Sequence, residues 1–192
     1  MKRFVVLFTA FLGAAFITAG CTNPRPEESS DQASLASQSS AAIDGFKNDD
    51  PTLKDLLAKS VGYAIFPEVG KAGFIAGGSY GKGEVFEGGK KIGHADISQA
   101  TVGLQAGAQT FNELIIFIRQ EELTKFKESQ FALAGNISAV AIKAGAAGTA
   151  DTSKGVVVFV RSTGGLMAEA AVGGQRFRFR PLDAASTEAA AK

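Results

Sequence analysis

The sequence has few of the residues that most often build metal and redox sites. It contains one cysteine, Cys21, and one histidine, His94, among 192 residues. One cysteine excludes a disulfide within the chain, and one histidine is too few for a metal site built from soft ligands. We therefore expect no metal ion and no cofactor. His94, with Asp96 nearby, is predicted at the surface close to a turn, in preference to a role as a ligand or a pH sensor.

The sequence also has no clear excess of basic or acidic residues. The chain has 20 basic and 19 acidic residues. Because two of the basic residues, Lys2 and Arg3, lie in the N-terminal segment, the rest of the chain carries 18 basic residues against 19 acidic ones. Nucleic-acid-binding domains usually carry a clear basic excess. We therefore predict no nucleic-acid partner.

The N-terminal apolar run, residues 4–17, is shorter than the roughly 20 residues that span a bilayer comfortably. Lys2 and Arg3 precede the run, and the small residues 18–20 follow it. A charged start, an apolar centre and a small-residue end are typical of a secretory signal. We predict a signal peptide over residues 1–20 that is removed by cleavage.

Cys21 directly follows this segment. The sequence Ile17-Thr-Ala-Gly-Cys21 resembles the bacterial lipobox, in which the thiol accepts a diacylglyceryl group and the cysteine becomes the new N-terminus. Each buried acyl CH₂ contributes about 0.8 kcal/mol, so several chains make a stable anchor. Thr22, where enteric sorting rules use Asp for inner-membrane retention, favours the outer membrane, facing the periplasm. The alternative is an ordinary secreted protein with a free thiol.

Composition divides the remaining chain. Residues 21–40 are rich in Ser, Gln, Pro and Glu, which indicates a flexible tether that begins at the acylated Cys21. Residues 41–182 suit one domain with its own core. Residues 183–192 are predicted as a disordered C-terminal tail.

Three short helices are expected in the domain. Residues 41–47 form a short amphipathic turn of helix, and a clearer helix covers residues 50–59, where Asp50 caps the start and three leucines share one face. We expect that face to pack on the domain and not to lie on a membrane. A third helix, residues 120–127, places Leu123 and Phe126 on one side.

Most of the other segments have strand character, with glycine, β-branched and aromatic residues between turn signals. The predicted strands are residues 61–66, ending at Pro67, then 72–80, 83–86, 97–107, 113–118, 137–142, 155–160, 165–172 and 175–180. Glycine is costly inside strands, so its frequency here indicates a tightly coiled sheet. The glycines assigned to this role are Gly73, Gly77, Gly78, Gly103, Gly107, Gly173 and Gly174. The predicted fold class is α+β, mainly β: a strongly coiled antiparallel sheet or partly open barrel with a few short helices.

One motif suggests catalysis. Residues 77–81, Gly-Gly-Ser-Tyr-Gly, fit the G-x-S-x-G nucleophile elbow of hydrolases. That chemistry needs a histidine base and an acid, which follow much later in that fold, whereas His94 comes soon after Ser79. A glycine-rich strand is the preferred interpretation. We predict that the protein is not an enzyme, with a hydrolase as the alternative.

Residues 62–83 resemble the opening of the SYLF domain, also known as the Ysc84 actin-binding domain. Their sequence is Gly-Tyr-Ala-Ile-Phe-Pro-Glu-Val-Gly-Lys-Ala-Gly-Phe-Ile-Ala-Gly-Gly-Ser-Tyr-Gly-Lys-Gly. Further similar stretches are residues 101–109, 131–133 with 139–141, 155–159 and 164–175. Together they span roughly residues 50–182. The resemblance implies a small non-enzymatic domain that binds membrane lipid. Actin, a partner of some eukaryotic members, is not expected in a bacterial periplasm.

The candidate binding residues are arginines near the C-terminus. In residues 176–180, Arg-Phe-Arg-Phe-Arg, a strand places Arg176, Arg178 and Arg180 on one face and the two phenyl rings on the other. Arg161, on a predicted neighbouring strand, extends the row. Arginine matches phosphate geometry, so the row is a candidate for anionic headgroups. The alternative is an edge strand whose charges only prevent aggregation.

We therefore expect a lipid-anchored periplasmic envelope protein whose domain binds anionic membrane lipid without catalysis. The alternative is a structural or stress-related envelope protein that binds another protein or peptidoglycan.

Overall fold

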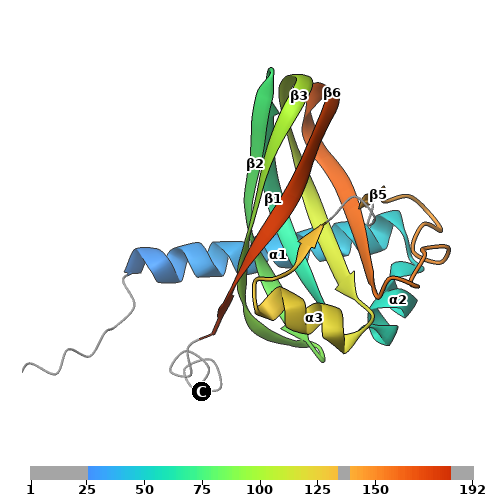
Figure 1. Ribbon diagram of the computed structural model, residues 1–192. Coiled ribbons are helices and arrows are strands. Elements are labelled where there is room, and N and C mark those ends of the chain that lie inside the picture. The colour runs from blue at the N-terminus through green and yellow to red at the C-terminus, as the bar shows by residue number, and fades with distance from the viewer. Residues whose placement is uncertain (1–25, 134–138, 183–192) are drawn as a thin grey trace, which may run out of the picture.

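The computed structural model describes residues 26–133 and 139–182, and these form a mainly β fold (Figure 1). Cys21 and the predicted tail, residues 183–192, lie outside the described residues. The helices are α1 (Pro26–Asp49), α2 (Leu53–Lys59) and α3 (Gln120–Lys127). The strands are β1 (Gly62–Gly73), β2 (Ala76–Glu87), β3 (Lys90–Phe117), β4 (Ala132–Leu133), β5 (Ala139–Ala141) and β6 (Val156–Pro181).

The strands form one coiled sheet in the order β1-β2-β3-β6-β4, with β5 beside β6 and an additional pairing of β1 with β3. Two strands are unusually long, since β3 has 28 residues and β6 has 26. Residues 90–102 of β3 pair with β2, whereas residues 107–117 pair with β1. β6 follows β3 along this whole path, so the β3–β6 ribbon wraps around the β1–β2 hairpin.

This sheet confirms the predicted fold class, because it is mainly β, strongly coiled and, in the described residues, not closed into a barrel. It is not purely antiparallel, however, since β5 pairs with β6 in parallel over three residues. Glycine supports the coiling where strands approach closely. A Cβ atom on Gly93 would lie 2.3 Å from the carbonyl oxygen of Arg180 and 2.5 Å from the Phe179 ring.

Several predicted strand boundaries are wrong. Residues 97–107 and 113–118 belong to one strand, β3, and residues 155–160, 165–172 and 175–180 belong to one strand, β6. β1 continues through Pro67, because the register of β1 shifts between residues 65 and 69 on both sides and this bulge accommodates the proline. The predicted strand over residues 72–80 is instead the end of a hairpin, with Phe74 and Ile75 at its turn. There the Phe74 N–H donates to the Ala76 carbonyl at 3.2 Å.

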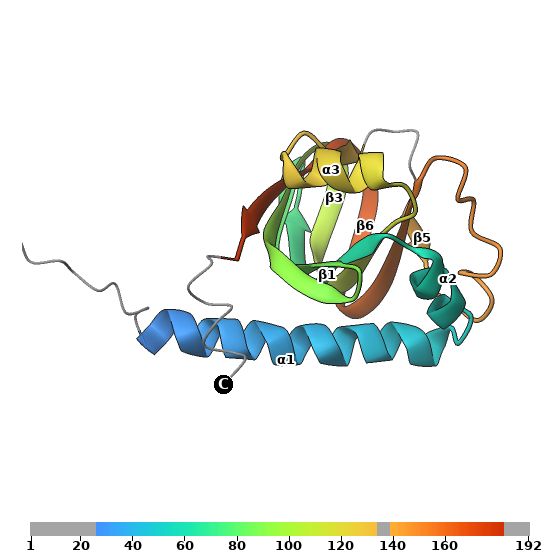
Figure 2. The same ribbon diagram turned by 90° about the horizontal axis from the view of Figure 1, so that it is seen from below.

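The tether prediction is wrong for residues 26–40, which are helical. α1 contains 24 residues and also includes the predicted short helix at 41–47. Its buried positions, Ser39, Ala42, Ile43 and Phe46, have helical spacing and face the sheet. Residues 26–40 resemble a linker in sequence because the rest of the helix surface is polar. The helix is stabilised because its one buried stripe packs on the sheet. Figure 2 shows α1 along the side of the coiled sheet.

α3 agrees with prediction, whereas α2 starts three residues later than predicted, with Thr52 and not Asp50 at its N-cap. α3 has the predicted bounds, and Leu123 and Phe126 are buried under it. α2 starts at Leu53, after a turn in which an Asp50 carboxylate oxygen accepts the Thr52 N–H at 3.0 Å. Leu53 and Leu56 are buried in the domain, as expected for a helix that packs on it.

Two hydrophobic clusters pack on opposite faces of the sheet. The inner cluster includes Phe66, Phe117, Phe126 and Phe177 and is covered by α3, which lies across the lower end of the coiled sheet (Figure 2). The outer cluster joins α1 and α2 to the sheet through residues such as Phe46. The helices gather toward one end of the sheet (Figure 1), and the two clusters join α1, α2 and α3 to the strands.

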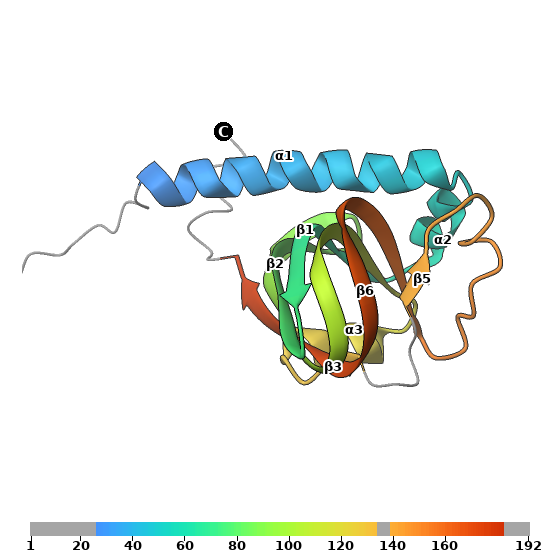
Figure 3. The ribbon, with the colours of Figure 1, turned by 90° about the horizontal axis from the view of Figure 1, so that it is seen from above.

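The sheet therefore has two unlike halves. We call residues 70–81, 98–112 and 162–175 the distal half, and the other strand residues the proximal half. Figure 3, seen from above, shows no helix across the distal end of the described structure. Every buried hydrophobic side chain that the structure describes in the sheet belongs to the proximal half.

Candidate functional site

The arginines of β6 alternate with phenylalanines as predicted. Arg176, Arg178 and Arg180 are exposed, whereas Phe177 is 4% exposed and Phe179 packs against the inner cluster. Pairing with β3 fixes the neighbours of the row, since Arg176 lies opposite Ser98 and Arg178 opposite Asp96. The strand thus places three guanidinium groups on one outer face.

Of these three arginines, Arg180 alone has an ion-pair partner among the residues that the structure describes. Arg180 forms an ion pair with Asp96 at 2.7 Å, and the Tyr80 hydroxyl also donates to Asp96, at 3.5 Å. Among the described residues, Arg176 and Arg178 have no ion-pair partner. Their guanidinium groups therefore remain available to an external anion.

Arg176 and Arg178 line a groove of about 600 Å³, which we call the arginine groove. The remaining lining residues come from β2, β3, β6 and the segment after α3: Tyr80, Asp96, Ser98, Ser129, Gln130, Phe131 and Phe177. Two cations, hydroxyl groups and aromatic rings at one surface suit an anionic group joined to an apolar body.

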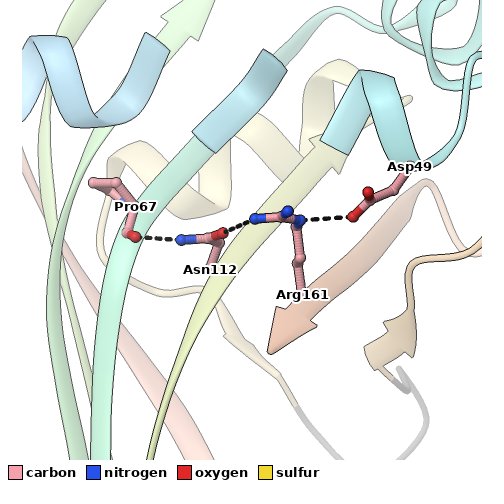
Figure 4. A network of polar contacts seen from close by, with 4 residues as sticks. All are labelled: Asp49, Pro67, Asn112 and Arg161. Atoms are coloured by element: carbon pink, nitrogen blue, oxygen red, sulfur yellow. Dashed lines mark hydrogen bonds and ion pairs between the residues drawn. The ribbon is translucent and has the colours of Figure 1, made fainter. Parts of the chain in front are cut away.

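Arg161 does not extend the row. Its Nε lies 2.6 Å from the Asp49 carboxylate, and its Nη1 donates to the Asn112 side-chain oxygen at 3.5 Å (Figure 4). The Asn112 amide in turn donates to the Pro67 carbonyl. Arg161 belongs to the first half of β6, opposite Asn112, whereas the row belongs to the second half. The prediction that Arg161 joins the row is therefore wrong: this arginine ties the end of α1 to the sheet.

The structure separates the two residues of the hydrolase alternative. Ser79 is buried, and its hydroxyl donates to the Gln99 side-chain oxygen at 3.3 Å. His94 lies five positions before Gln99 on β3, so the two side chains project to opposite faces of the sheet. Ser79 and His94 therefore form no nucleophile and base pair.

His94 is half-buried on the outer face, in register with Glu84 and Arg180. Burial lowers the pKa of His94, the nearby Lys91 and Arg180 lower it further, and Glu84 and Asp96 oppose them. The imidazole is therefore neutral near pH 7. Within residues 26–133 and 139–182, no group of three or more His, Cys, Asp or Glu side chains is placed to hold a metal ion.

The distal half carries an exposed apolar apex that the sequence patterns did not predict. The apex consists of Phe74 and Ile75, at the β1–β2 turn, and Val102 on β3, with exposed fractions of 71%, 63% and 70%. Val102 pairs with Ala76 in the adjacent strand, so the three residues lie at the same end of the sheet. In the sequence, the signal for this apex is a pair of large apolar residues, Phe74 and Ile75, flanked by Gly73 and Gly77.

A second groove, of about 640 Å³, adjoins the apex on the same strands. Glycine and alanine form most of its lining, which includes Gly70, Ala72, Gly78, Ala108, Gly164 and Gly165, and the exposed Tyr80 also lines it. We call it the glycine groove. The small residues leave the outer sheet surface bare and mostly apolar there.

Glu113 is a buried acid that no sequence pattern predicted. It is fully buried in β3 and accepts a hydrogen bond from the Gln175 amide at 2.9 Å, and its other carboxyl oxygen has no hydrogen-bond partner among the described residues. Burial raises the pKa of Glu113 to about 7 despite the Gln175 hydrogen bond. The group is therefore half-protonated near neutral pH.

None of the helices in the described part of the chain is both long and apolar enough to cross a bilayer. The predicted anchor, Cys21, is outside the residues that the structure describes, and its acylation stays a prediction.

Residues 98–185 match the sequence model of a family described as Ysc84, Las17-binding protein actin regulator. The match confirms the resemblance to the SYLF (Ysc84) family, and it includes all of β6 with the arginine row. No curated protein matches the chain.

Proposed function

We propose that this chain, whose residues 98–185 carry the Ysc84 family match, is a lipid-anchored protein of the bacterial envelope that binds anionic membrane lipid without turnover. The observation that carries the proposal is the pair Arg176 and Arg178. Both side chains are exposed, line one groove and have no ion-pair partner among the described residues.

The chemistry of the arginine groove favours a phosphate-bearing headgroup. A guanidinium donates two parallel N–H bonds to a phosphate, and Ser98 adds a hydroxyl to the same groove. Near an anionic membrane each such cation contributes about 1 kcal/mol, so two give a weak preference by themselves.

Attachment through Cys21 compensates for this weakness. An acylated cysteine holds the domain close to the bilayer, which raises the effective concentration of headgroups at the groove. α1 begins five positions after Cys21 and, with 24 residues at 1.5 Å each, is about 36 Å long. The connection between anchor and sheet therefore acts as a spacer with a defined shape over most of its length.

The partners in the family description do not transfer with the match. Las17 and actin are named for the family, and actin is not expected in the periplasm that the lipobox resemblance implies. Binding without turnover is supported by the separation of Ser79 from His94.

Vesicle co-sedimentation tests the headgroup preference. Residues 22–192 contain every described element of the fold and omit Cys21, so they report on the domain alone. We expect this chain to bind vesicles containing phosphatidylglycerol more tightly than neutral phosphatidylcholine vesicles. Arg176→Gln with Arg178→Gln should reduce that preference about tenfold or more.

The matched control is Lys54→Gln with Lys59→Gln, which removes the same charge from exposed positions on α2. It should leave the preference largely unchanged. Equal binding of the unsubstituted chain to both kinds of vesicle would refute the headgroup proposal. The anchor is tested separately by mass spectrometry of the N-terminus isolated from bacterial membranes, where an unmodified residue 21 would refute it.

A further inference from the structure

The apex exposes large apolar side chains to water, which is energetically unfavourable. Phe74, Ile75 and Val102 are each more than 60% exposed, although the chain buries most of its other large apolar side chains that the structure describes. Exposed apolar residues gathered at one end of a protein usually mark a surface that contacts another apolar phase.

The distal half is also almost free of charge. Residues 70–81, 98–112 and 162–175 contain only two charged residues, Lys71 and Glu169, together with eleven of the 23 glycines. Charged side chains impose the largest penalty on entry into a bilayer, and this half of the sheet nearly lacks them.

The arginines of β6 lie at a distance from the apex that suits the phosphate layer of a membrane. Val102 pairs with Val172, and Arg176 is four residues further along β6. At about 3.3 Å per residue, Arg176 lies roughly 13 Å from the apex along the strand, and Arg178 lies two residues, about 7 Å, further away. A tip that exposes Phe74, Ile75 and Val102, followed by two arginines with no ion-pair partner among the described residues, is complementary to an apolar layer covered by phosphates.

The backbone hydrogen bonds near the apex also suit the apolar interior of a bilayer. β1 and β2 pair with each other up to Gly73 and Gly77, and both pair with β3 at this end. Their polar backbone groups are therefore largely satisfied within the sheet, which is a requirement for backbone that enters lipid.

We propose that the apex inserts into the outer layer of an anionic phospholipid bilayer, with Phe74, Ile75 and Val102 among the acyl chains and Arg176 and Arg178 at the phosphates. This inference rests on the proposed function and adds the element that enters the membrane. A bilayer fits better than a second copy of the chain, because stable protein interfaces bury about 1,200–2,000 Å² and three side chains on a projecting turn offer far less.

A fluorescent probe in residues 22–192 tests the insertion directly. This part of the chain has no cysteine, so Ile75→Cys provides a unique thiol for an environment-sensitive dye. With phosphatidylglycerol vesicles we expect a blue shift and quenching by brominated acyl chains. The matched control is Thr124→Cys, at an exposed position of α3 at the opposite end, and its dye should remain in water.

Affinity gives a second measurement. Phe74→Ser with Ile75→Ser should weaken binding to the same vesicles about tenfold or more, since both side chains lose their apolar contacts. Val140→Ser, at an exposed apolar position on β5, should leave affinity unchanged. Unaltered melting temperatures would show that all variants fold.

The outcomes separate the two proposals. Binding with anionic preference, but with the Ile75 dye still in water, would overturn insertion and leave the headgroup proposal standing. Absence of binding to every vesicle would overturn both. A blue shift that depends on protein concentration without vesicles would assign the apex to a contact between copies and overturn insertion.

Discussion

The proximal and distal halves of the sheet are built from the same strands but depend on different interactions. In the proximal half, large side chains such as Phe66 and Phe117 fill an inner core, and helices cover the outside. The buried residues described in the distal half are small or polar, with Ser79, Thr101 and Asn112 among them. Strand pairing therefore maintains the distal half, whereas apolar burial stabilises the proximal half. One continuous sheet can thus combine a stable base with an end that is free to contact a ligand.

The largest effect should come from a cavity in the proximal core. Phe117 is fully buried and its ring lies 5.1 Å from that of Phe126, between centroids. Phe117→Ala should lower the free energy of unfolding by about 3–5 kcal/mol. Denaturation in urea measures this value. A loss below about 1 kcal/mol would show that the base does not depend on its core.

Glu113 lies at the border of the two halves and should make stability depend on pH. Its carboxyl has a pKa of about 7 in the folded protein, compared with an ordinary glutamate pKa of 4.5 in an unfolded chain. Between pH 4.5 and pH 7, the Glu113 carboxyl is largely ionised in the unfolded chain but still protonated in the folded protein. The free energy of unfolding should therefore fall by about 3 kcal/mol as the pH rises from 4.5 to 7.

Glu113→Gln removes this ionisation and retains an acceptor for the Gln175 amide. The variant should therefore be more stable than the original chain at pH 8 and similar to it at pH 4.5. Urea denaturation at both pH values checks this, and an equal stability difference at the two values would contradict the buried ionisation.

Arg161 should have a smaller effect, confined to the attachment of α1. Its ion pair with Asp49 is partly exposed, with both side chains near 40% accessible, so solvent screens it. Arg161→Gln should cost about 0.5–1 kcal/mol and increase hydrogen exchange at the end of α1. Unchanged exchange in α1 would show that the outer cluster alone holds the helix.

The smallest effect on stability should come from the apex. Phe74 is 71% exposed, so Phe74→Ser should change the free energy of unfolding by less than about 0.5 kcal/mol. Thermal denaturation without lipid measures this change. A loss as large as that of Phe117→Ala would remove the distinction between the halves.

Local patterns in the sequence predicted the features that depend on neighbouring residues. The period of two in residues 176–180 gave the correct faces for the arginines, and helical spacing gave α3 with its buried Leu123 and Phe126. Frequent glycine correctly indicated a strongly coiled sheet. For the arginine row and α3, the spacing that decides the outcome lies within a few positions of the chain.

The errors concern contacts between distant segments. Residues 26–40 look like a linker until Ser39 and its neighbours pack on the sheet. Arg161 bonds to a residue 112 positions earlier, which no local pattern reveals. Pro67 is tolerated in β1 only because a bulge interrupts pairing on both sides. The apex was missed because Phe74 and Ile75 were assigned to a strand and not to a turn.

The full-length pairing of β3 with β6 also bears on how the chain folds. Gly93 pairs with Pro181, so the outer edge of β3 has no partner until almost the entire domain has been synthesised. Contacts between such distant residues form slowly, and an unpaired strand edge promotes aggregation in the meantime. A chain that ended before residue 156 would lack its last long strand, and the exposed edge of β3 would make the incomplete sheet prone to aggregation.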